Sequence, residues 1–159
     1  MNDRRDDLDD VDAAIVAQLE RDARTTNAEL AAIAGVAPST AHARLRALES
    51  RGVVRGYHAS VDHAQLGRGL QAIIGVTLRP GKRQESLTDF TAHVKRLPQV
   101  IQAFFLGGVD DFLVHVAVAD SSELRRFVVD HISEQATVAS TRTSVIFSYS
   151  RNAVVPAFE

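Results

Sequence analysis

The 159-residue chain contains no cysteine and no long apolar run. Without cysteine it cannot form disulfides, thiolate zinc sites, iron–sulfur clusters or a cysteine nucleophile. No stretch approaches the roughly 18 apolar residues that a membrane-spanning helix needs. Residues 1–12 are polar and acidic, without the basic start and apolar stretch of a signal peptide. These absences favour a cytoplasmic protein without a membrane partner.

The sequence motifs of common enzymes are missing as well. The chain has no Gly-x-Ser-x-Gly elbow, phosphate-binding loop or dinucleotide fingerprint. His58 and His63 lie in a predicted turn and linker, and no His-Glu-x-x-His pattern accompanies them. Asp110 and Asp111 are adjacent in the sequence, which is a poor arrangement for a general acid and base. We therefore expect no enzymatic activity, no metal site and no resident cofactor.

Positive charge is not in excess overall, but it is unevenly placed. Eighteen Lys and Arg stand against 20 Asp and Glu, a net charge of −2, which by itself argues against a nucleic-acid partner. Residues 1–12 hold two arginines and six aspartates, a charge of −4, whereas residues 39–60 hold four arginines and one glutamate, a charge of +3. Residues 61–159 balance at ten against ten. The basic excess is therefore local, as DNA binding requires.

The first 60 residues predict three helices. Asp9 or Asp10 can cap a helix whose apolar residues, from Val11 to Leu19, follow helical spacing. Thr26 or Asn27 can cap a second helix, and Thr26 with Glu29 fits a capping box; Gly35 ends it. A third helix is predicted from Pro38 to about Ser50. Residues Val53–Val61 alternate between apolar and polar side chains and predict a short wing or strand.

The second part predicts a different fold class. Strands are expected at Leu70–Arg79, Val100–Leu106, Phe112–Ala119 and Val138–Ser148, and helices at Glu85–Leu97 and Ser121–Ile132. This order, βαββαβ, is the ferredoxin-like plan. The whole chain is then an α+β protein with a domain at 1–60, a linker at 61–69, a ferredoxin-like domain at 70–150 and a tail at 151–159.

A short helix, a glycine turn and a second short helix indicate a DNA-binding helix-turn-helix. A helical wheel of Pro38–Ser50 turns Pro38, Ala41, Leu45 and Leu48 inward and leaves a small, polar and basic outward face. Small side chains allow close approach to base edges, and arginine can bind guanine or phosphate. We expect arginines on phosphates, with Arg46 also suited to a base edge. The DNA-binding candidates are Ser39, Thr40, His42, Ala43, Arg44, Arg46, Arg51 and Arg55.

The same residues resemble the Lrp/AsnC family of transcription regulators, also called feast/famine regulators. The matching segments are Leu8–Asp12, Arg24–Ala31, Gly35–Thr40, Arg44–Glu49 and Gly52–Tyr57, followed by Leu66-Gly67. The resemblance implies a winged helix-turn-helix joined to a βαββαβ effector and oligomerisation domain. It also implies homodimers that assemble into octamers or other even-numbered forms and bind pseudo-palindromic double-stranded DNA.

The resemblance further implies a small-molecule effector, usually an amino acid, bound near the loop between the second and third strands. A second pocket segment enters the last strand, where hydroxyl groups can bond a polar ligand. Asp110 replaces the family's usual aromatic residue, so the loop could select a basic ligand or could have lost typical amino-acid binding. The alternative to effector binding is a plain strand turn, because two glycines with two aspartates are common in turns. The effector-binding candidates are Gly107, Gly108, Val109, Asp110, Asp111, Ala139, Ser140, Thr141 and Thr143.

The sequence thus predicts a sequence-specific DNA-binding transcription regulator of the Lrp/AsnC type, modulated by a small molecule that we expect to be an amino acid. One alternative stays open, because any three-helix bundle shows such spacing. The chain could be an effector-sensing interaction module whose helix-turn-helix contacts protein and not specific DNA.

Overall fold

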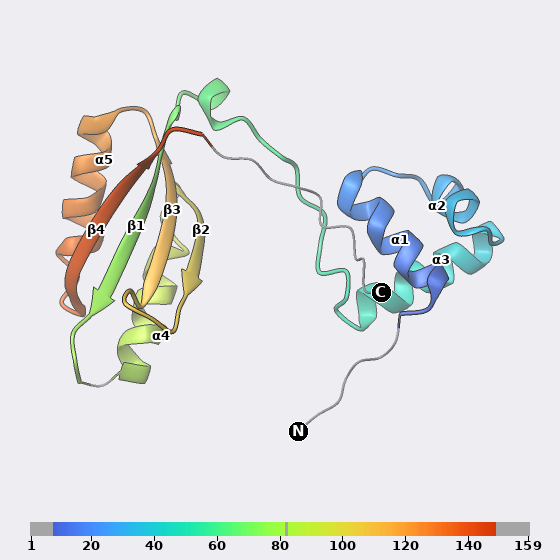
Figure 1. Ribbon diagram of the computed structural model, residues 1–159, viewed down its shortest axis with the longest axis horizontal. Helices are drawn as coiled ribbons and strands as arrows, with labels where there is room; N and C mark the ends of the chain where they lie inside the picture. Colours follow the sequence, from blue (N-terminus) through green and yellow to red (C-terminus); the bar gives the residue numbers. More distant parts are fainter. Residues whose placement is uncertain (1–7, 82, 149–159) are drawn as a thin grey trace. The chain divides into compact units, whose positions relative to one another are not determined.

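The computed structural model describes residues 8–81 and 83–148 (Figure 1). The chain divides into two compact units, with the boundary between Ser60 and Val61. We call residues 8–60 the first unit and residues 61–148 the second unit, and describe each by itself. The predicted tail at 151–159 lies outside the described residues.

The first unit consists of the three predicted helices, α1 (Asp10–Arg21), α2 (Asn27–Ala34) and α3 (Pro38–Ser50). Asp9 caps α1, since its carboxylate accepts from the Asp12 N–H at 2.9 Å. The predicted capping box forms at α2, where Thr26 and Glu29 satisfy each other's backbone N–H groups. Gly35 ends α2 in the left-handed conformation, at φ 67°.

The core of the first unit is small. Its fully buried members come one from each helix: Ile15, Leu30 and Leu48. Ala41 is also buried, as predicted, but Pro38 is exposed, so its expected inward orientation is wrong. The reason lies in how α3 meets α2. Pro38 opens the first turn of α3, and that turn meets α2 through its backbone, because the Asn27 side-chain amide donates to the Pro38 carbonyl at 2.9 Å.

The predicted wing does not form. Residues 53–61 contain neither a strand nor a helix. Gly52, at φ 71°, turns the chain back so that the N–H groups of Val53 and Val54 both donate to the Leu48 carbonyl. A strand needs a partner for its remaining backbone groups, and the described part of the first unit contains only helices.

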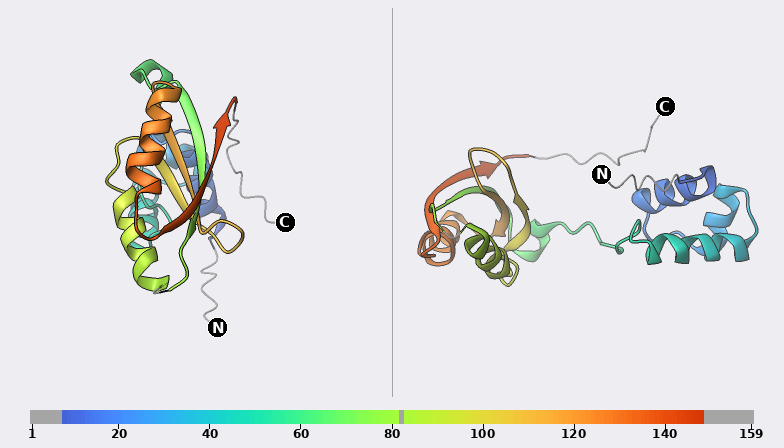
Figure 2. Two further views of the ribbon diagram at one scale, coloured as in Figure 1. Left: turned by 90° about the vertical axis from the view of Figure 1, so that its left-hand side faces the viewer. Right: turned by 90° about the horizontal axis from the view of Figure 1, so that it is seen from below.

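The second unit has the predicted βαββαβ order. Its strands are β1 (Leu70–Leu78), β2 (Val100–Phe105), β3 (Phe112–Val118) and β4 (Val138–Ile146), with α4 (Arg83–Val94) and α5 (Ser121–Phe127) between them. A short 3-10 helix, His63–Leu66, precedes β1. The strands form an antiparallel sheet in the order β2-β3-β1-β4, which is the ferredoxin-like arrangement. Both helices cover the same face of this sheet (Figure 2).

One predicted helix is interrupted. The expected Ser121–Ile132 helix is α-helical only to Phe127 and continues as a π-helix, Val128–Ser133. Glu134 N–H accordingly bonds the Val129 carbonyl, five residues back. The widened turn exposes the His131 carbonyl to α4, where His93 Nε2 donates to it at 2.7 Å.

Alternation along the strands divides the sheet into two faces. The face under the helices carries the large core, which includes Ile74, Val76, Val114 and Val116. The other face, which we call the helix-free face, carries the residues between them. It combines polar groups with the partly exposed apolar side chains of Ile73, Phe104, Leu113 and Ile146. Among the described residues, no helix is long and apolar enough to cross a membrane.

Candidate functional sites

The outward face of α3 has the composition that the sequence predicted. Ser39, Thr40, His42, Ala43 and Arg46 are exposed on it. The opposite face is anchored in the first unit's core by Ala41 and Leu48, both fully buried. The helix therefore presents small and polar side chains first and a cation one turn later, a pattern that suits the edge of a DNA groove.

Two arginines of this region are held by a carboxylate of α1. Asp12 is only 3% exposed, and its two oxygens lie 3.4 Å from Arg44 Nη1 and 3.6 Å from Arg51 Nη1. Arg44 also pairs with Asp9 at 2.7 Å. The Asp12 N–H, followed by the Arg44 guanidinium, lowers the pKa of Asp9 below its ordinary value. Asp12 thus fixes where both cations stand relative to α3, a role that the sequence did not indicate.

A third carboxylate organises the end of α3. Glu49 lies 3.6 Å from the Arg46 guanidinium and accepts from the Tyr57 hydroxyl at 2.9 Å. Burial, followed by the Glu49 carboxylate, raises the pKa of Tyr57. This contact ties the irregular segment after α3 to the helix and leaves Arg55, between them in sequence, exposed. Arg46 keeps a side chain that is 73% exposed.

The candidate effector loop is a tight connection between β2 and β3. It closes where the Leu106 N–H donates to the Asp111 carbonyl at 2.8 Å. A Cβ at Gly107 or Gly108 would meet no atom within 4 Å, and Val109 is 84% exposed. Asp111 instead points inward, where its carboxylate accepts from the Leu78 N–H at 2.7 Å, beside the irregularity in β1–β4 pairing. Asp111 therefore supports the sheet, and the loop leaves its two glycines and Val109 exposed.

Asp110 forms an ion pair across β1 with Arg142, which is not among the predicted effector-binding residues. Its carboxylate oxygen lies 2.6 Å from Arg142 Nη2, from β4. The carboxylate rests against Gly75 of β1: a Cβ there would lie 2.8 to 2.9 Å from three of its atoms. From the sequence, only the alternation of side chains along β4 could have indicated the face on which Arg142 lies. That alternation does not show that Gly75 leaves room for the Asp110 carboxylate beside Arg142.

The second predicted effector segment is split between the two faces. Thr141 and Thr143 pair with the core residues Val76 and Ile74 and face the helices; the Thr141 hydroxyl lies 3.4 Å from that of Ser133 in the π-helix. Ser140 and Arg142 pair with Thr77 and Gly75 and lie on the helix-free face. Ala139 lies at the irregularity in β1–β4 pairing, between Val138 and Ser140. Of the predicted hydroxyls, only that of Ser140 therefore shares a face with Asp110.

Comparison with known proteins matches both units to one family. Residues 8–49 match the AsnC-type helix-turn-helix domain, and residues 71–152 match the Lrp/AsnC ligand binding domain. The HTH-type transcriptional regulator AldR of Mycolicibacterium smegmatis is 45% identical over 150 residues, which cover 94% of this chain and 87% of that protein. The chain belongs to the Lrp/AsnC family. The predicted identity as a helix-turn-helix transcription regulator is thereby confirmed.

Two solved structures resembling this Lrp/AsnC regulator contain an amino acid. A transcriptional regulator from Neisseria meningitidis in complex with L-methionine aligns with a TM-score of 0.84 at 31% identity, covering 93% of this chain and 95% of the other. The feast or famine regulatory protein from M. tuberculosis complexed with L-methionine aligns at 0.83 and 32% identity, covering 94% and 99%. Both alignments extend over the two units.

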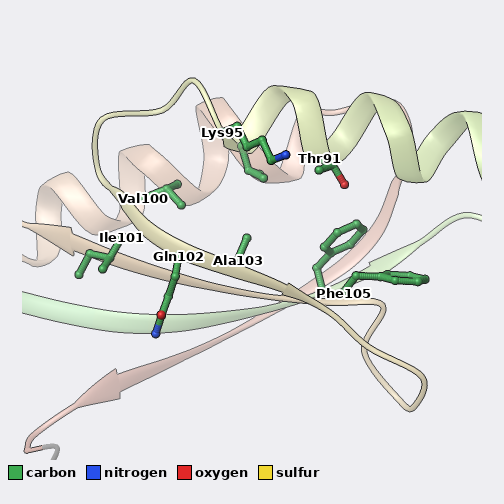
Figure 3. A pocket seen from close by; sticks show the side chains of 9 residues that line it. Thr91, Lys95, Val100, Ile101, Gln102, Ala103 and Phe105 are labelled. Atoms are coloured by element: carbon green, nitrogen blue, oxygen red, sulfur yellow. The ribbon is translucent and has the colours of Figure 1, made fainter. Parts of the chain in front are cut away.

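The regulator also has a groove away from the predicted effector residues. It lies between α4 and the edge strand β2, measures about 290 Å³ and is lined largely by apolar side chains, including Val100, Ile101 and Phe105, with Thr91 and Lys95 at its border (Figure 3). None of the predicted effector residues lines it. Within the described residues, no group of three or more His, Asp or Glu side chains is placed to hold a metal ion.

Proposed function

We propose that this Lrp/AsnC regulator binds operator DNA through the outward face of α3. The exposure pattern of α3 supports this best, because Ser39, Thr40, His42 and Ala43 stand outward on a helix whose other face is buried. These four side chains would line the major groove, and Arg46 would bind a base edge or phosphate. Arg55 would bind phosphate from the segment after α3. Arg44 and Arg51 would do so in positions that Asp12 fixes.

The decisive measurement is operator affinity across salt concentrations, for example by fluorescence anisotropy on DNA from upstream of the protein's own gene. Arg46→Ala should cost about 1–3 kcal/mol if this residue binds a base. Arg126→Ala, which removes an exposed arginine of α5, is the matched control and should leave affinity unchanged. Equal affinity for operator and unrelated DNA, with no effect of Arg46→Ala, would favour the alternative in which α3 binds a protein.

We further propose that an amino acid regulates the DNA binding from the second unit. The L-methionine complexes of two structural relatives support this chemical class. Gly107 and Gly108 of the Leu106–Asp111 loop are exposed and carry no side chain, so a carboxylate could approach their backbone closely. Binding can shift the regulator only as far as the ligand's affinities for its two states differ. A thermal-shift panel of the twenty amino acids tests the proposal, since a ligand stabilises the state that it binds.

The helix-free face is the surface that we propose for homodimerisation. Ile73, Leu113 and Ile146 are partly exposed there, and Phe104 is 46% exposed, although all four are apolar residues of ordered strands. A two-fold dimer would present two α3 helices to a pseudo-palindromic operator, and dimers would assemble into octamers or other even-numbered forms. We expect a cytoplasmic regulator that acts by binding and not by catalysis. Phe104→Asp should shift sedimentation towards the monomer, whereas Val129→Asp, at an exposed position of the π-helix on the opposite side of the sheet, should shift it less.

A further inference from the structure

Arg142 and Asp110 form an ion pair whose geometry depends on the absence of a side chain between them. Gly75 and Arg142 are register partners on adjacent strands β1 and β4. Asp110 comes from the β2–β3 loop on the other side of β1. Because Gly75 has no Cβ, the Asp110 carboxylate can lie directly on β1, and it meets Arg142 Nη2 at 2.6 Å. The loop and the last strand are thus joined across the central strand.

The two partners differ in how much solvent they meet. The Asp110 side chain is 11% exposed, whereas the Arg142 side chain is 66% exposed. Among residues 8–81 and 83–148, Asp110 is the only ionic partner of Arg142. A guanidinium carries five N–H donors in a planar fork, so donors remain on its outward side. The carboxylate is the buried support, and the guanidinium is the group presented to a ligand.

This arrangement changes the role that Asp110 can have in ligand binding. The sequence left open that its acidic group selects a ligand with a basic side chain. The carboxylate, however, is already bound by Arg142 and lies against β1. The charged group available to a ligand beside the exposed Gly107-Gly108 turn is therefore the guanidinium of Arg142, held in place by Asp110. The ion pair is neutral overall, so it suits a ligand that carries both charges better than one with an additional anionic group near Asp110.

We propose that Arg142, oriented by Asp110 over Gly75, binds the α-carboxylate of the amino-acid effector and selects zwitterions with an uncharged side chain. This inference rests on the proposed amino-acid regulation and adds the residue that recognises the carboxylate. Arg142 contacts the ligand directly, and Asp110 and Gly75 are positioning residues. Guanidinium–carboxylate pairs can be bidentate, which provides both attraction and orientation.

The test compares an acid with its amide, because only the acid has a carboxylate. L-Methionine and L-methioninamide are titrated calorimetrically into wild type and Arg142→Ala, alongside each of the other amino acids. Arg142→Ala should weaken L-methionine about tenfold or more, the usual size for a lost charged hydrogen bond, and should leave the amide unchanged. Gly75→Ala and Asp110→Asn should each weaken the acid several-fold, through displacement of the carboxylate and loss of its charge. Arg126→Ala is the control.

The outcomes separate this inference from the function on which it rests. If wild type binds no amino acid in the panel, both the amino-acid effector and the role of Arg142 are refuted, while operator binding can still be measured. If wild type binds but Arg142→Ala weakens acid and amide equally, or neither, only the inference is refuted. The ligand-free melting temperature and sedimentation of each variant show whether a loss reflects unfolding or altered assembly, and a loss that follows those changes also overturns the role in ligand binding.

Discussion

Each unit contains a carboxylate that is nearly buried and paired with arginine, but the two differ in what they hold together. In the first unit Asp12, 3% exposed, joins α1 to two arginines of the α3 region. In the second unit Asp110 joins a loop to one arginine of β4. Both arrangements leave arginine side chains partly exposed, at 41% for Arg44 and 66% for Arg142. In our proposals, the same chemistry would serve phosphate binding in one unit and carboxylate binding in the other.

The size of the hydrophobic core in each unit determines how much the ion pair contributes to that unit's stability. The hydrophobic cluster of the first unit is built on three large buried side chains, one per helix, so each contact between helices contributes a large share of its stability. The second unit rests on a core of fourteen buried residues that spans the sheet and its helices. The Asp110–Arg142 pair lies on the opposite face from that core. A polar site can therefore change in the second unit with little effect on the fold, whereas in the first unit fold and binding surface are coupled.

Loss of a core side chain from the first unit should give the largest effect. Leu48→Ala removes a fully buried residue of α3 and should cost about 2–5 kcal/mol. Operator binding should disappear while the strands of the second unit keep their protection in hydrogen-exchange mass spectrometry. Ile33→Ala, at a position 51% exposed, is the control. Parallel loss of protection in both units would contradict their independence.

The two aspartates should respond differently to the same substitution. Asp12→Asn leaves the two arginines without their buried counter-charge and should destabilise the first unit by about 1–3 kcal/mol. Asp110→Asn should change stability by less than about 1 kcal/mol, because its partner is mostly solvated. Denaturation followed by hydrogen exchange in each unit provides both values. A larger loss of stability for Asp110→Asn than for Asp12→Asn would contradict this expectation.

Arg55 should reveal the electrostatic part of DNA binding by itself. It is exposed and is proposed to bind phosphate, so Arg55→Ala should weaken operator and unrelated DNA to a similar, modest extent. The slope of log affinity against log salt should fall by about 1. Arg46→Ala should weaken the operator selectively. An operator-selective loss for Arg55→Ala would instead place that residue at a base.

Acid should weaken the units in different pH ranges. The Thr26 N–H and hydroxyl lower the pKa of Glu29 in the first unit; its contribution is complete above the ordinary carboxylate pKa and is lost as pH falls through the lowered value. In the second unit burial, followed by nearby His63, lowers the pKa of His115. The unfolded chain then takes up a proton that the folded chain resists, so stability falls once pH drops below about 6.5.

This pH effect is expected to be the smallest of the four. His115 donates to Gln71 and faces the Gln102 amide, which suits a neutral ring. His115→Gln should therefore flatten the pH dependence of the second unit's stability below about pH 6.5 without altering the first unit. Unit-resolved hydrogen exchange at several pH values measures this. An unchanged pH dependence in the variant would show that His115 does not cause the loss.

Local signals explain why the helices and the strand order could be predicted. The capping groups Asp9 and Thr26, the break at Gly35 and the proline at the start of α3 all act within a few residues of themselves. The failures are non-local or depend on geometry. The wing at Val53–Val61 had the right alternation but no strand to pair with. Pro38 followed the apolar stripe but lies where α3 meets α2 through its backbone.

The sequence by itself determined two units of different class, the small outward face of α3 and the family to which the chain belongs, because periodicity, caps and motif spacing are encoded along the chain. Only the tertiary structure decided which charges pair with one another and which stay exposed. Asp12 stands 32 residues before Arg44, and Asp110 stands 32 before Arg142. Such partners come into contact because helices pack and strands align in register. The Asp110–Arg142 contact also requires the absence of a Cβ at Gly75.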